Sequence, residues 1–179
     1  MRLGRLVRGA LVVAALVFAL ALLRAWSGRP REDSRSRPPE TVEGPARITD
    51  GDTLHVDGRT IRLRGVDAPE RAQSCTGPDG AAYACGERAR GALGALVEGR
   101  TVACRIRGRD RYRRWLGRCR AGDEDVGERL VRDGLAVAYR DPAYAEAEAE
   151  ARRARRGLWA GTFEEPEQWR RERRARASR

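Results

Sequence analysis

Three carboxylates lie near the ends of two apolar strands in an otherwise basic chain. Asp52 belongs to the stretch DGDT, and Asp67 and Glu70 belong to the stretch VDAPE. Ionised acids in such places repel one another and lose hydration, so they are costly unless a cation lies between them. Ca²⁺ takes carboxylate and carbonyl oxygens as ligands. Asp52 and Asp67 therefore predict a site for a hard divalent cation.

The neighbouring residues predict hydrolytic chemistry at this cation. Glu70 follows Asp67 after Pro69 has stiffened the turn, so it can reach a metal-bound water and act as a general base. Arg62 and Arg114 can clamp a phosphate through paired hydrogen bonds. Taken singly, DGDT is usually a turn, DAPE a loop or helix entry, and a lone arginine a solvated charge. The prediction of phosphodiester hydrolysis therefore depends on the combination.

The charge of the chain favours a polyanionic partner. Its 179 residues carry a formal net charge of +11, and all 37 basic residues are arginine. Nucleic acid and an anionic membrane surface both suit such a charge. The complete absence of lysine also indicates a compositional habit, which weakens the argument from charge alone.

Residues 1–26 are predicted to be a signal anchor or a signal peptide. Arginines precede an apolar run from Gly9 to Leu23, which Arg24 ends. The run is shorter than the roughly 20 residues of a full membrane span. We expect an uncleaved anchor that places the body outside the cytoplasm, periplasmic or extracellular; a cleaved segment would give a secreted protein. Residues 27–44, polar and proline-containing, are interpreted as a flexible linker.

Four cysteines follow the expected export segment: Cys75, Cys85, Cys104 and Cys119. An even number in that context predicts two disulfides. A bridge between the first two would staple a loop, and one between the last two would join the arms of a hairpin, although three pairings are possible. A zinc site is disfavoured because there is no C-x2-C pair and His55 is the only histidine.

Residues 45–163 are predicted to form one domain of the α+β class. Asp57-Gly58 predicts a tight hairpin turn, and the first arm of the hairpin can be two strands broken at DGDT. About five strands and about three helices are expected, with the helices over residues 86–98, 125–134 and 142–156. Hairpin-connected short strands suit an OB-fold-type five-stranded barrel, here preceded by an N-terminal hydrophobic helix. Residues 164–179 are expected to be a basic C-terminal tail, either solvated or an extra polyanion contact.

Several motifs, in order and at suitable spacings, resemble the staphylococcal-nuclease-like (thermonuclease) family. They are DGDTLHVDGRTIRLRGVDAPE, RDRYRRWLGRC, DVGERLVRDGLAVAY and ARRARRGLWAG, and they span about residues 45 to 163. The resemblance implies an OB-type barrel and Ca²⁺-dependent hydrolysis of DNA and RNA phosphodiester bonds. It does not decide between DNA and RNA, and no protein partner is predicted.

The resemblance also implies roles for individual residues. The metal ligands match Asp52, Asp67 and the main-chain carbonyl of Ala68; the catalytic residues match Arg62, Glu70 and Arg114; the substrate-contacting tyrosines match Tyr112 and Tyr139. The family loop usually reads D-[RK]-Y-G-R, whereas Arg113 stands here at the glycine. Glycine permits backbone angles that arginine resists. Arg113 is expected to share part of the substrate-binding role of Arg114.

Strand alternation alone does not bring these residues together. It places Arg62 on the opposite face from Leu63 and Asp67, so convergence requires a bend near Gly65. Two other functions also remain possible: a non-catalytic single-stranded nucleic-acid-binding module on the same fold, and a membrane-tethered interaction protein with a degenerate site. The presence of all five polar site residues favours the enzyme.

Overall fold

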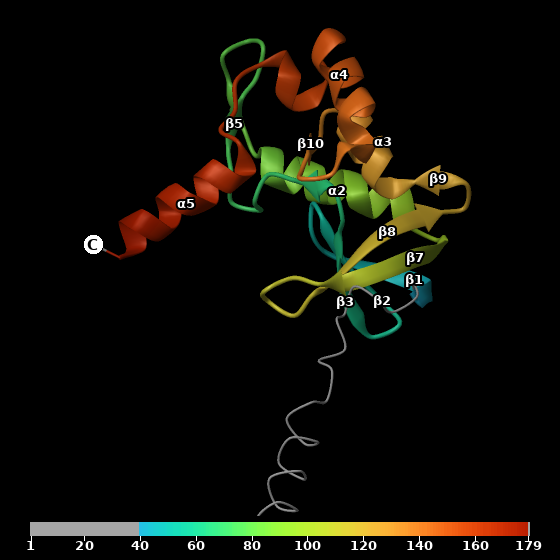
Figure 1. Ribbon diagram of the computed structural model, residues 1–179. Coiled ribbons are helices and arrows are strands. Elements are labelled where there is room, and N and C mark those ends of the chain that lie inside the picture. Colours follow the sequence, from blue (N-terminus) through green and yellow to red (C-terminus); the bar gives the residue numbers. More distant parts are fainter. Residues whose placement is uncertain (1–39, 179) are drawn as a thin grey trace, which may run out of the picture. The chain divides into compact units, whose positions relative to one another are not determined.

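The structure is a computed structural model that describes residues 40–178 (Figure 1). The predicted signal segment at residues 1–26, and the linker up to residue 39, lie outside the described residues. Between residues 40 and 178 no helix combines the length and apolar character needed to cross a bilayer.

A closed β-barrel forms the centre of the domain. The strand order of the main sheet is β3-β2-β1-β7-β8-β9, and β3 also pairs with β8 in parallel, which closes five strands into a barrel. The strands are β1 (Glu40–Asp50), β2 (Thr53–Val56), β3 (Arg59–Leu63), β7 (Thr101–Arg109), β8 (Trp115–Ala121) and β9 (Glu124–Asp125). The predicted five-stranded barrel with packed helices is confirmed, and its architecture is consistent with an OB-type fold.

The hairpin turns form where the sequence predicts them. Asp57 and Gly58 both adopt left-handed backbone angles, with φ of 47° and 68°, and join β2 to β3. The break between β1 and β2 falls within DGDT, as expected. One boundary differs: residues 40–44, assigned to the linker, are the first part of β1. Val42 is buried opposite Cys104 of β7, so burial and strand pairing extend the sheet into this polar stretch.

Two short ladders lie beside the barrel and hold the loops that carry site residues. One pairs β4 (Val66–Asp67) with β10 (Val137–Ala138), and the other pairs β5 (Cys75–Thr76) with β6 (Ala82–Tyr83). The first ladder fixes Asp67, and the second closes the loop that follows Glu70.

The helices within residues 40–178 are α2 (Cys85–Val97), α3 (Val126–Arg132), α4 (Ala145–Arg153) and α5 (Pro166–Ala177), with 3₁₀ turns η1 (Pro142–Tyr144) and η2 (Gly157–Ala160). Helix α2 buries Ala89, Leu93 and Val97 on the predicted apolar stripe. Helix α3 begins after Asp125, whose carboxylate accepts a hydrogen bond from the Glu128 amide at 3.0 Å.

Helix α5 differs from the sequence prediction, which assigned its residues to a basic tail. Proline in the first turn and a run of glutamate, glutamine and arginine are compatible with a helix. Its C-terminal half, from Arg173 to Ser178, is exposed and extends away from the barrel (Figure 1). Its N-terminal half contacts the site described below.

Both favoured disulfide pairings are present. Cys104 and Cys119 lie opposite each other on β7 and β8, with their Cα atoms 4.0 Å apart. Cys75 and Cys85 close the loop before α2, with their Cα atoms 5.6 Å apart. The Cys104–Cys119 bridge joins two neighbouring strands of the barrel. The Cys75–Cys85 bridge connects the loop after Glu70 to the start of α2.

Candidate active site

Asp52 and Asp67 meet at the guanidinium group of Arg62. Nη1 of Arg62 forms an ion pair with Oδ2 of Asp52, and Nη2 lies 2.6 Å from Oδ1 of Asp67. The Asp67 side chain is only 1% exposed, and that of Arg62 is 13% exposed. The structure thus brings together three predicted site residues from the β1–β2 turn, β3 and β4.

The turn at Gly65 makes this meeting possible. Strand β3 ends at Leu63 and β4 begins at Val66, and Gly65 between them has φ of 83°. A Cβ atom at this position would lie 3.1 Å from the Tyr144 ring, so both the backbone angle and the available space favour glycine. The predicted bend near Gly65 is confirmed, and it returns Asp67 to the side of Arg62.

Burial makes the charge on Asp52 costly. Loss of hydration raises the pKa of the Asp52 carboxyl above its usual range, and repulsion from Asp67 adds to this effect. Attraction by Arg62 and a hydrogen bond from the Thr53 hydroxyl, 2.8 Å from Oδ1, act in the opposite direction. The amide of Ala68 also points at Oδ2 of Asp52, at 3.4 Å. Two buried acids that repel each other are suited to binding a cation.

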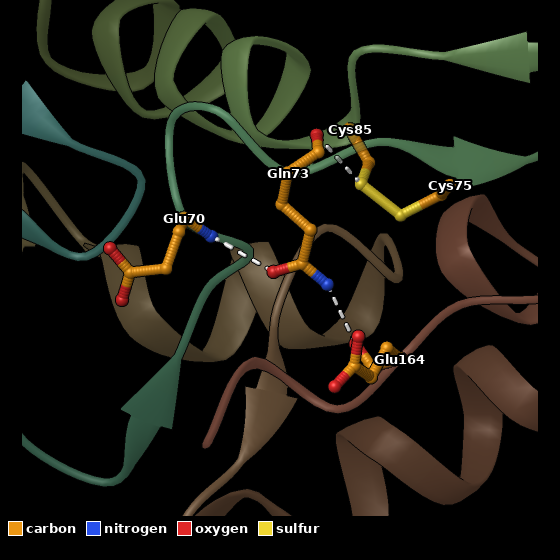
Figure 2. Close-up of a disulfide and its surroundings, with 5 residues drawn as sticks. All are labelled: Glu70, Gln73, Cys75, Cys85 and Glu164. Atoms are coloured by element: carbon orange, nitrogen blue, oxygen red, sulfur yellow. Dashed lines mark hydrogen bonds between the residues drawn. A yellow bond between two sulfur atoms is a disulfide. The ribbon is translucent and has the colours of Figure 1, made fainter. Parts of the chain in front are cut away.

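Glu70 is held at the mouth of this cluster by its backbone. The Glu70 amide donates to Oε1 of buried Gln73 at 3.2 Å, and the Gln73 amide nitrogen donates to the carbonyl oxygen of Glu164 at 2.7 Å (Figure 2). The Glu70 side chain points away from this anchor (Figure 2). Gln73 therefore links the turn that carries Glu70 to the segment that leads into α5.

Helix α2 packs directly on the Glu70 backbone. A Cβ atom added at Gly86 would lie 1.8 Å from the Glu70 carbonyl oxygen, so only glycine permits this approach. The Gly86 amide donates to the Gln73 carbonyl at 3.2 Å, and the Cys85 sulfur lies 3.3 Å from the same oxygen (Figure 2). The disulfide loop and α2 together set the position of Glu70.

Arg114 approaches the cluster from the β7–β8 loop. Its Nε and Nη2 pair with Oδ2 of Asp110 at 2.8 and 2.7 Å, and its Nη1 lies 3.5 Å from the Thr53 hydroxyl. Thr53 faces Arg62 across the β2–β3 pair. Arg114 therefore joins the other predicted residues through Thr53, while Asp110 fixes the direction of its guanidinium group.

The loop before Arg114 keeps the backbone shape that a glycine would favour. Arg113 has φ of 67°, and the Arg113 amide donates to the Asp110 carbonyl at 3.0 Å. Arg113 is exposed, and none of the contacts found among residues 40–178 places its side chain at the acid cluster. Tyr112 is 60% exposed, with the Arg114 guanidinium 5.5 Å from its ring centre. An exposed ring of this kind is free to stack on a nucleotide base.

Tyr139 lies on the other flank of the cluster. Its amide donates to the Gly65 carbonyl at 2.9 Å, and Arg140 stacks 4.7 Å from its ring centre. Burial raises the pKa of the Tyr139 hydroxyl, and the carboxylates of Glu167 and Asp67 raise it further. Tyr139 therefore borders both Asp67 and the first turns of α5.

One member of the cluster escaped the sequence prediction. Arg170 of α5 places Nη1 2.9 Å from Oδ1 and Nη2 2.8 Å from Oδ2 of Asp67, and Nη1 is also 2.8 Å from Oε1 of Glu70. Burial lowers the pKa of Arg170, but the hydrogen bonds to Asp67 and Glu70 outweigh it and raise the pKa overall. Arg170 stands in an arginine-rich run, so nothing in the sequence distinguishes it from its neighbours.

The residues present suit a hard cation such as Ca²⁺. Asp52 and Asp67 offer buried carboxylate oxygens on either side of one guanidinium group, the type of donor that Ca²⁺ prefers. Within residues 40–178 no group of three His, Cys, Asp or Glu side chains is arranged around a metal-sized position. Backbone oxygen from Ala68 and water would have to complete such a site.

Comparison with known proteins shows the family of the chain. Residues 60–161 match the family described as staphylococcal nuclease homologue. The chain belongs to that family. It is 40% identical over 126 residues to the succinoglycan biosynthesis protein ExoI of Rhizobium meliloti. The matched stretch covers 67% of this chain and 65% of that protein. The chain thus spans about two thirds of the length of this relative.

Two further relatives of this staphylococcal nuclease homologue are matched over more of their length. A protein of Haemophilus influenzae named as an uncharacterized endonuclease is 33% identical over 136 residues, 70% of this chain and 71% of that protein. Protein ParB of Escherichia coli is 38% identical over 146 residues, 70% of this chain and 77% of that protein.

Proposed function

We propose that the chain is a Ca²⁺-dependent nuclease of the thermonuclease type that hydrolyses phosphodiester bonds of DNA, RNA or both. The observation that carries the proposal is the meeting of Asp52 and Asp67 at Arg62, with Glu70 joined to Asp67 through Arg170 and Arg114 joined to the cluster through Thr53. Membership of the staphylococcal nuclease homologue family and the endonuclease names of relatives support it.

The chemistry follows from the roles these side chains can take. Ca²⁺ held by Asp52, Asp67 and the Ala68 carbonyl would supply positive charge to a phosphoryl oxygen and to water. Glu70, at the mouth of the cluster, removes a proton from the attacking water as general base. Its anchoring by Gln73 and Gly86 limits how far the carboxylate can move from that position.

The two arginines bind the phosphate. A guanidinium group carries five N–H donors, so Arg62 retains donors for phosphoryl oxygens while it contacts both acids. Asp110 orients the Arg114 guanidinium group through charge-assisted contacts to Nε and Nη2. Charge that develops on the phosphoryl oxygens is then met by donors that are already in place. Tyr112 and Tyr139 are the proposed contacts to the nucleotide on either flank.

Export or membrane anchoring is part of the proposal. Two disulfides within a domain of this size suit an oxidising compartment. The apolar segment at residues 9–23 suits an anchor or a signal. We propose that the nuclease domain lies outside the cytoplasm, attached to the membrane or secreted.

The test is hydrolysis of single-stranded DNA and of RNA by the purified full chain, with Ca²⁺ or with a chelator. We expect cleavage only with Ca²⁺, and neither cleavage nor calorimetric Ca²⁺ binding in the double variant Asp52→Asn, Asp67→Asn. Tight, salt-sensitive binding of single strands without cleavage in any divalent metal would contradict the proposal and favour a non-catalytic binding module.

A further inference from the structure

We propose that the Arg170 guanidinium group stands in for Ca²⁺ in the metal-free enzyme. It pairs with the carboxylates of Asp67 and Glu70, and Ca²⁺ must displace it in order to bind. The inference rests on the proposed function, since it requires the metal at Asp67. It assigns helix α5, outside the stretch matched by the family model, a direct part in controlling the site.

The contacts of Asp67 carry the inference. Arg170 engages both carboxylate oxygens of Asp67, at 2.9 and 2.8 Å, and Arg62 engages Oδ1 at 2.6 Å. Ca²⁺ would need to lie 2.3–2.6 Å from those same oxygens. Each carboxylate oxygen has two lone pairs: Arg62 and Arg170 take both at Oδ1, and Arg170 takes one at Oδ2. Departure of Arg170 frees one lone pair on each oxygen for Ca²⁺ while Arg62 keeps its contact, and repulsion between two cations on the same pair of oxygens opposes binding of Ca²⁺ while Arg170 stays.

Glu70 is held by the same guanidinium group. Nη1 of Arg170 lies 2.8 Å from Oε1 of Glu70, whereas a general base must direct its oxygen at water. When Arg170 leaves, the metal ligand and the base are released in one event. Occupation of the metal site is therefore linked to availability of the base.

Helix α5 is attached in a way that permits this release. Its start is fixed by the Gln73 hydrogen bond to the Glu164 carbonyl and by buried Pro166, the first residue of the helix. Beyond Arg170 the helix is largely exposed, and its hydrogen bonds and ion pairs there are within the helix itself. Within residues 40–178, one side-chain ion pair besides those of Arg170 joins α5 to the rest of the domain. It links Arg140 to Glu167 at 2.8 Å and is exposed. An exposed pair of this kind contributes little.

The first test is calorimetric measurement of Ca²⁺ affinity in the full chain, in the absence of nucleic acid. We expect Arg170→Gln to lower the Kd for Ca²⁺ about 10-fold, within the usual range of coupling between competing sites. The matched control is Arg174→Gln, which removes the same charge from an exposed position of the same helix. Its Kd should stay within about twofold of the wild type, since a surface charge beyond the cluster is screened.

The outcomes separate this inference from the proposed function. If neither the wild type nor Arg170→Gln binds Ca²⁺, the metal assignment itself fails. If both bind with the same Kd, or if Arg170→Gln binds more weakly, Arg170 does not compete with the metal and the inference alone is overturned.

A second measurement needs no variant. Hydrogen exchange of residues 166–177 in the wild type should become faster when Ca²⁺ is added, because a detached helix of 12 residues is marginally stable in water. Unchanged or slower exchange in α5, at Ca²⁺ concentrations that saturate the site, would overturn the displacement.

Discussion

Replacing Arg62 by glutamine should destabilise the metal-free protein in a way that Ca²⁺ repairs. Arg62 separates two buried acids, and removing one partner of a buried ion pair typically costs 3–5 kcal/mol. Asp67 loses one guanidinium contact but keeps Arg170, so only Asp52 is left without a guanidinium partner. Asp52 retains hydrogen bonds from the Thr53 hydroxyl and the Ala68 amide. The expected loss is therefore at the lower end of the range, about 3 kcal/mol.

The assay is thermal and urea unfolding of the full chain, with chelator and with saturating Ca²⁺. For a domain of this size, about 3 kcal/mol corresponds to a decrease in Tm of about 10 °C in chelator. Ca²⁺ should recover most of the loss, because the metal takes the place of the guanidinium group between Asp52 and Asp67. Arg105→Gln on the exposed face of β7 is the control and should change stability by less than about 0.5 kcal/mol.

Two results would refute this reasoning. A loss below about 1 kcal/mol in chelator would mean that the acids do not depend on Arg62. A loss of the expected size that Ca²⁺ leaves unchanged would mean that the metal does not bind between Asp52 and Asp67.

Further predictions concern the groups that position the site. Burial alone would raise the pKa of the Asp110 carboxyl, but hydrogen bonds from Arg114 outweigh it and hold this pKa below its usual range. The ionised carboxylate therefore stabilises the fold at neutral pH, and this stabilisation is lost as pH falls through the folded pKa. Asp110→Asn should thus cost about 1 kcal/mol at pH 7 and less near pH 3, measured by urea unfolding; an equal cost at both would contradict this. Arg113→Gly should stabilise the fold by about 0.5–1 kcal/mol, because the backbone strain removed at this left-handed position exceeds the conformational entropy that glycine loses on folding. A lower Tm would contradict this prediction. Gly86→Ala should lower hydrolysis at least about 10-fold while Ca²⁺ still binds, because the new Cβ pushes on the Glu70 carbonyl; unchanged hydrolysis would show that Glu70 needs no such support.

Local features of the fold followed from the sequence because short-range chemistry determines them. Asp57-Gly58 forms the tight turn since both residues tolerate positive φ, and Asp125 caps α3 through its own carboxylate. The Cys104–Cys119 pairing was favoured, although not fixed, by the assignment of the two residues to adjacent arms of one hairpin, and the structure contains it. Each of these depends on residues that are close in sequence or in one hairpin.

The remaining features depend on contacts that the sequence pattern does not encode. Arg170 meets Asp67 across a separation of 103 residues, and a chain with arginine at every basic position gives no sign of which one enters the site. The amide of buried Gln73 bridges Glu70 and Glu164, which requires the segment that leads into α5 to be in place. The role of Val42 in β1 likewise depends on β7, which is formed about 60 residues later.

The acid cluster itself was predicted by combining residue types with the family resemblance, and its geometry came from the turn at Gly65. Alternation along β3 separates Arg62 from Asp67, and only a left-handed residue between β3 and β4 reunites them. The catalytic and metal-binding roles of these residues remain predictions for the experiments described above.

The measurement that tests the central claim most directly is the rate of single-stranded DNA hydrolysis by Glu70→Gln at saturating Ca²⁺. We expect a decrease of at least about 100-fold, because a general base contributes that much or more, with Ca²⁺ still bound. Glu98→Gln, which neutralises an exposed acid at the end of α2, should hydrolyse DNA at the wild-type rate. Hydrolysis by Glu70→Gln at the wild-type rate would contradict the assignment of Glu70 and, with it, the proposed mechanism of this site.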